Sequence, residues 1–69
     1  MRYEELTCLV LYAAKALKNM GKIGVTASEI AEFIRREYNV DVDVQQVFAI
    51  LRQLFTYDPF RDRFLLTSN

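Results

Sequence analysis

Apolar residues recur at spacings of three and four over the first twenty positions, which predicts an amphipathic helix over residues 3–20. The apolar set expected on its inner face is Leu6, Leu9, Val10, Ala13, Leu17 and Met20. Glu4 near the start and Lys18 near the end suit the helix dipole, and Gly21 is suited to ending the helix. The short apolar stretch at residues 23–25 is interpreted as a single strand.

The segment Thr26-Ala27-Ser28-Glu29 has the form of a capping box and predicts the start of a second helix. In that motif the threonine hydroxyl accepts a hydrogen bond from the glutamate amide, and the glutamate carboxylate accepts one from the threonine amide. The apolar spacing that follows predicts a helix over residues 27–38. Asn39 tolerates the left-handed conformation that commonly ends a helix.

A third helix is predicted over residues 44–56, with Asp43 as its N-cap. Its apolar positions again follow helical spacing and predict an inner face of Val44, Val47, Phe48, Leu51, Leu54 and Phe55, with Ile50 on the flank. The helical pattern then stops, because Pro59 disfavours helical geometry at the residue before it.

The remaining residues predict a β-hairpin over 56–67. Residues 58–62 supply turn-forming side chains, and residues 64–67 have the composition of a strand. We expect residues 56–58 to pair with residues 63–65. Phe60 is expected to anchor the hairpin in the core.

These elements predict one domain over residues 1–69, of mainly α (α+β) class, with three helices and a C-terminal β-hairpin. The chain is 52% hydrophobic and has nine aromatic residues, enough for a compact core despite its 69 residues. No repeat or linker divides it.

The composition excludes most kinds of catalytic and metal-binding site. Cys8 is the single cysteine and there is no histidine, so an internal disulfide and a cysteine- or histidine-based metal site are excluded. Asp41 and Asp43 lack a third ligand, and Cys8 lacks a basic partner, which favours a buried structural thiol. We therefore expect no enzyme activity, cofactor or metal. The longest apolar run, residues 8–14, is too short to span a membrane, and no signal peptide is evident, so a cytoplasmic location is expected.

The outer face of the third helix has residue types that read DNA bases. Arginine binds guanine and glutamine binds adenine through two hydrogen bonds, and a small side chain allows close approach to the groove. The residues on this face are Gln45, Gln46, Ala49, Arg52 and Gln53. Further basic candidates for phosphate contact are Arg61 and Arg63 in the hairpin and Arg35 and Arg36 at the end of the second helix. The alternative for all of them is an ordinary solvated surface.

The first helix has apolar side chains beyond its inner stripe, at Cys8, Leu11 and Tyr12. They have two interpretations. Either they pack against the C-terminal hairpin, or they form the interface of a homodimer, since a small domain seldom leaves such a patch bare.

Over nearly its full length the chain resembles the winged helix-turn-helix superfamily. The resemblance is carried by the capping-box segment with its continuation Ile30-Ala31-Glu32-Phe33, after a short strand, and by the third helix through Leu54. It implies that residues 44–56 form a recognition helix for double-stranded DNA and that Arg61 and Arg63 lie on the wing. Small members of this superfamily are commonly transcription regulators.

Charge bears on this expectation, because DNA-binding proteins usually carry a basic excess and this chain has nine basic and nine acidic residues. DNA binding therefore requires the basic groups to gather on one face, or a dimer to double a modest patch. Should acids intersperse the arginines, the alternative gains: a winged-helix module that binds a protein partner within a larger assembly and does not bind DNA.

Overall fold

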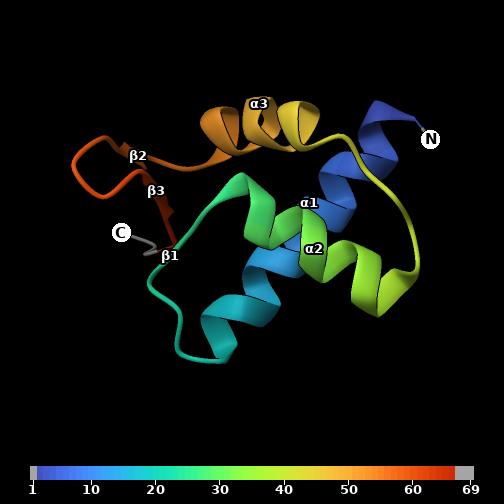
Figure 1. Ribbon diagram of the computed structural model, residues 1–69, viewed down its shortest axis with the longest axis horizontal. Coiled ribbons are helices and arrows are strands. Elements are labelled where there is room, and N and C mark those ends of the chain that lie inside the picture. The colour runs from blue at the N-terminus through green and yellow to red at the C-terminus, as the bar shows by residue number, and fades with distance from the viewer. Residues whose placement is uncertain (1, 67–69) are drawn as a thin grey trace.

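The computed structural model describes residues 2–66 and contains three helices and one three-stranded antiparallel sheet (Figure 1). In chain order the elements are α1 (Tyr3–Asn19), β1 (Gly24–Val25), α2 (Ala27–Tyr38), α3 (Val44–Leu54), β2 (Tyr57–Asp58) and β3 (Arg63–Leu65). The predicted fold class, mainly α (α+β) with a C-terminal β-hairpin, is confirmed. Thr67, the last residue of the predicted hairpin, lies outside the described residues.

The first helix ends one residue earlier than predicted, at Asn19. Gly21 has a left-handed backbone (φ 98°), and the amide of Lys22 donates to the carbonyl of Leu17 at 3.0 Å. This arrangement closes the helix and turns the chain away from its axis. Met20 therefore does not reach the inner face where it was predicted, and it is 73% exposed.

The second helix begins as predicted. The Thr26 hydroxyl accepts from the amide of Glu29 at 3.1 Å, and the Glu29 carboxylate accepts from the amide of Thr26 at 2.9 Å. Asn39 takes the left-handed conformation at the other end of α2, with φ 56°. The start of this helix is thus closed by the side chains of the capping box, and its end by the left-handed backbone of Asn39.

The third helix is two residues shorter than the predicted 44–56, and it ends at Leu54. Phe55 is extended, with φ −132° and ψ 158°. The carbonyl of Thr56 accepts from the amide of Leu65 at 2.9 Å. Pairing with the final strand therefore draws this segment out of the helix.

The sheet has the strand order β1-β3-β2, so the last strand lies between the other two. Tyr57 pairs with Phe64 in the hairpin, and Val25 pairs with Phe64 on the other side. The predicted pairing of residues 56–58 with 63–65 is present. The predicted strand 23–25 is reduced to Gly24–Val25, although the carbonyl of Ile23 still accepts from the amide of Leu66 at 2.9 Å.

The core lies where the three helices meet the inner face of the sheet. Its largest fully buried side chains are Phe64, Ile30, Ile34, Ile50, Leu51, Val10, Val25 and Val47. Ile50 was expected on the flank of the third helix but is 1% exposed, whereas Phe48 and Leu54 are 37% and 42% exposed. The helix is therefore rotated from the predicted inner face, toward Ile50.

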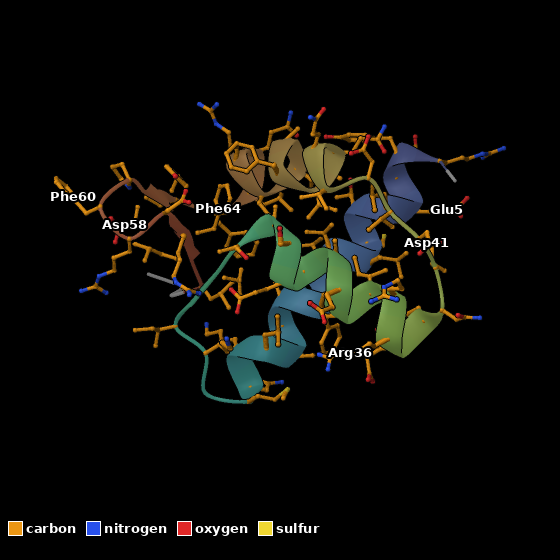
Figure 2. All side chains as sticks on the ribbon, in the orientation of Figure 1. Glu5, Arg36, Asp41, Asp58, Phe60 and Phe64 are labelled. Atoms are coloured by element: carbon orange, nitrogen blue, oxygen red, sulfur yellow. The ribbon has the colours of Figure 1, made fainter. Side chains whose placement is uncertain are left out.

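The hairpin is anchored by Phe64, and the prediction that Phe60 would do this is wrong. The Phe64 side chain is 1% exposed, and its ring lies 5.1 Å from the rings of both Phe48 and Tyr57. Phe60 is 98% exposed at the end of the hairpin farthest from the helices (Figure 2). The reason is its place in the turn, where the strands separate it from the core.

These two phenylalanines supply a matched test of the packing. Phe64→Ala should lower the free energy of unfolding by about 3–5 kcal/mol, because it leaves a cavity in the core. Phe60→Ala should change it by less than about 0.5 kcal/mol. Urea unfolding at low protein concentration, followed by circular dichroism, measures both. Similar losses for the two variants would contradict the described packing.

Candidate nucleic-acid interface

Helix α3 lies along one edge of the molecule, with its outer side uncovered by other elements (Figure 1). The five predicted base-reading residues on it are all exposed. None of the eleven residues of α3 is acidic. Asp43 precedes the helix, and its Oδ1 accepts from the amide of Gln45 at 2.9 Å, so its carboxylate caps the helix.

The five predicted base-reading residues of α3 divide into two rows along the helix. One row contains Gln45, Ala49 and Arg52, which are spaced by four and three residues and so share a face. Gln46 and Gln53 lie on the side toward α1, where the Tyr3 hydroxyl donates to Oε1 of Gln53 at 3.1 Å. The row of Gln45, Ala49 and Arg52 is the stronger candidate for base contact.

The two hairpin arginines, which we expect to contact phosphates, are held in different ways. NH1 of Arg63 lies 2.8 Å from Oε1 of Glu29, in an ion pair between β3 and the start of α2. Arg61 is two-thirds exposed, and its Nε lies 3.8 Å from Oδ2 of Asp58. Each arginine is thus next to a carboxylate of the same chain, and Arg63 is held against the body of the protein.

Glu29 is the centre of this ion-pair network. Its Oε2 lies 2.7 Å from Nζ of Lys22, while Oε1 accepts from the amide of Thr26 and from Arg63. Partial burial alone raises the pKa of the Glu29 carboxyl. The hydrogen bonds from Lys22 and Thr26 and the charges of Lys22 and Arg63 outweigh this effect and lower the pKa from 4.5 to about 2.

Arg35 of α2 lines a groove that reaches Val44 of α3, whereas Arg36 does not line it. Arg35 and Arg36 are both exposed in the last turn of α2. Arg36 projects from the side of α2 that is turned away from α3 (Figure 2). Arg35 lines that groove together with Glu32 and Asp41. The five predicted phosphate- and base-contacting arginines therefore do not form one basic face, and acids lie among them.

The three residues of the predicted dimer interface are all exposed. The prediction of a buried thiol is wrong, because Cys8 is exposed. The buried face of α1 is formed by Leu6, Val10, Ala13, Ala14 and Leu17. Leu11 and Tyr12 are 43% and 60% exposed, so the hairpin does not bury them.

Two of these residues line a hollow that sequence reasoning missed, here named the α1 groove. Its volume is about 470 Å³, and its apolar lining is Leu11, Tyr12, Ala14, Leu54, Phe55 and Leu66. Lys15 and Lys18 complete its lining. The groove thus lies between α1 and the base of the hairpin, and it exists only because residues 54–66 fold back beside α1. No local pattern signals that contact.

Comparison with models of protein families, with curated proteins and with solved structures finds no match to this chain. Within residues 2–66, no helix is long and apolar enough to cross a membrane. The same residues contain no cluster of three potential metal-ligating side chains among His, Cys, Asp and Glu.

The network around Glu29 should make the stability of the fold depend on pH. Because the pKa of this carboxyl is lower in the folded chain than its ordinary 4.5, its contribution is complete above pH 4.5 and is lost as pH falls toward about 2. Glu29→Gln should lower the free energy of unfolding by about 1–2 kcal/mol near neutral pH. The difference from the wild type should shrink across that acid range.

Urea unfolding at a series of pH values measures this difference, and Glu32→Gln is the matched control. Glu32 lies exposed on the same helix, and its replacement should cost less than about 0.5 kcal/mol throughout. A constant difference between the wild type and Glu29→Gln from neutral to acid pH would show that the ion pairs of Glu29 add no stability.

Proposed function

We propose that this protein is a DNA-binding transcription regulator of winged-helix type, which reads the major groove with α3. The observation that carries the proposal is the exposed face of α3, which lies at the edge of the molecule and is free of acidic residues within the helix. An uncovered helix of this length fits the major groove of B-form DNA.

The row of Gln45, Ala49 and Arg52 supplies the chemistry of base reading. Arg52 is suited to two hydrogen bonds with guanine, and Gln45 to two with adenine. Ala49 lies between them along the row, and its small side chain lets the helix approach the base edges. The carboxylate of Asp43 is engaged in the cap of α3, which reduces its repulsion of nearby phosphates.

Phosphate contacts contribute less than in a strongly basic protein. The chain has no net charge, and Arg63 is engaged by Glu29. A homodimer compensates by presenting two copies of α3 to two half-sites and doubling the contacts. We therefore propose that the protein acts as a homodimer inside the cell.

Replacing Arg52 separates base reading from general attraction. Arg52→Ala should weaken binding to a preferred site by about 1–3 kcal/mol and relax the sequence preference at one position of each half-site. Arg36→Ala removes the same charge from the side of α2 turned away from α3, so it should change affinity for that site little. Equal losses for the two variants would contradict base reading by Arg52.

The proposal as a whole is tested by selection from a random-sequence duplex pool at about 50 and 200 mM salt. Enrichment of a two-fold-related motif, with binding that weakens at the higher salt, is the expected result. Failure to retain any duplex at the lower salt would refute DNA binding.

A second candidate function is a winged-helix module that binds a protein partner without binding DNA. It is favoured by the carboxylates beside Arg61, Arg63 and Arg35, which leave no continuous basic face. The absence of duplex binding at low salt, together with an unchanged fold, would favour this function over the first.

A further inference from the structure

Phe60 is the most exposed large apolar side chain of the described residues, at 98%. It lies in the hairpin tip, defined here as residues 58–62, and projects away from the helices (Figure 2). Single exposed apolar residues are common on protein surfaces. An aromatic ring at the end of a structured projection is different, because aromatic side chains that fill a pocket on a partner supply much of the binding energy of protein interfaces.

The conformation of the hairpin tip is held by its own aspartates. Oδ1 of Asp58 accepts from the amide of Phe60 at 3.0 Å. Asp62 has a left-handed backbone (φ 53°), and its Oδ1 accepts from the hydroxyl of Tyr57. These hydrogen bonds order the turn before any partner binds, which lowers the entropy cost of placing Phe60 in a pocket.

The α1 groove is a suitable receptor for such an anchor. A cavity of about 150 Å³ lined by apolar side chains is large enough for benzene, and the groove holds about 470 Å³. Its lining includes Tyr12 and Phe55, which can contact a phenyl ring at its face or edge. The groove is not filled by the chain's own Phe60, which is almost fully exposed.

The charges of the two surfaces are complementary. The hairpin tip has Asp58, Asp62 and Arg61, a formal charge of −1. The α1 groove is lined by Lys15 and Lys18, and no acidic side chain of the described residues lines it. Two grooves placed face to face would bring the Lys15 side chains of both copies together, whereas the tip against the groove joins opposite charges.

We propose that the hairpin tip of one copy of this chain docks in the α1 groove of a second copy, with Phe60 as the anchor. The exchange is reciprocal, so each copy contributes one tip and one groove. Leu11 and Tyr12 then belong to the dimer interface as groove residues, and Cys8 lies outside the contact. This inference concerns the homodimer of the proposed function and does not depend on binding to DNA.

The layout of the hairpin makes the exchange geometrically simple. Phe55 and Leu66 lie at its base, in the groove, and Phe60 lies at its tip. Phe60 follows Phe55 by five positions along the chain, so a strand-like path between them spans no more than about 17 Å. Two hairpins lying antiparallel about a two-fold axis therefore place each tip near the base of the other, which closes the dimer.

The mass of the protein in solution tests the dimer. Light scattering over about 1 µM to 1 mM should show a monomer–dimer equilibrium for the wild type, and Phe60→Ala should weaken dimerisation about tenfold or more. Tyr12→Asp should do the same, while Tyr38→Asp, the same change on the exposed face of α2, should leave dimerisation unchanged. Circular dichroism checks that each variant is folded.

Mixing two variants tests which surfaces meet. Phe60→Ala retains an intact α1 groove, and Tyr12→Asp retains an intact hairpin tip. At a concentration where each alone is monomeric, the mixture should form heterodimers with one restored contact, detected by native mass spectrometry. A symmetric contact of α1 with α1 predicts no such rescue, and its absence would overturn the proposal.

Other outcomes also decide the matter. A wild type that stays monomeric to about 1 mM would overturn the proposal. A Phe60→Ala variant that dimerises normally but bends a DNA duplex less would also overturn it, since this result would place Phe60 against DNA.

Failure of the dimer proposal can be distinguished from failure of the DNA proposal. Arg52→Ala should keep the wild-type mass and lose base preference, whereas Phe60→Ala should lose the dimer in the absence of DNA.

Discussion

The ion pairs and the hydrogen bond of the Glu29 carboxylate link the start of α2 to the central strand of the sheet, and the positions of the hairpin and its side chains depend on them. The carboxylate caps α2 through the amide of Thr26, and it binds Lys22 before β1 and Arg63 in β3. Three segments that are separate along the chain are thus fixed to one side chain that remains ionised across the physiological pH range. Because Arg63 belongs to the central strand, this contact also orients the hairpin, and through it Phe60 at the hairpin tip.

The same network occupies two of the basic residues, Lys22 and Arg63, in ion pairs with Glu29. A neutral chain binds nucleic acid only if its positive groups are available, and Arg63 is engaged in holding the sheet to α2. What remains is the face of α3, where Arg52 is accompanied by glutamines and no acids. On the proposed function, this helix would contribute more to discrimination between bases than to general attraction, and a second copy would supply the affinity that charge does not.

The hairpin contains two phenylalanines in opposite environments. Phe64 is buried and joins the sheet to the helices, while Phe60, four residues away, is fully exposed. The turn between them is ordered by side-chain hydrogen bonds within the hairpin tip, so the exposed ring has a defined position. In the proposed dimer, this position lets the Phe60 ring enter the α1 groove at the base of the hairpin of the second copy.

The sequence by itself determined the helices, the strands and their order, since caps and apolar spacing act over a few residues. Helical periodicity also placed the five polar residues of the outer face of α3 at the surface, although it did not show that the buried side of the helix is rotated toward Ile50. Only the tertiary structure decided that Arg63 binds Glu29, 34 residues away, and that Tyr3 binds Gln53, 50 residues away. It likewise decided that Phe60 is exposed and that a groove forms beside α1. Such features depend on how distant segments pack, and local periodicity carries no information about that packing.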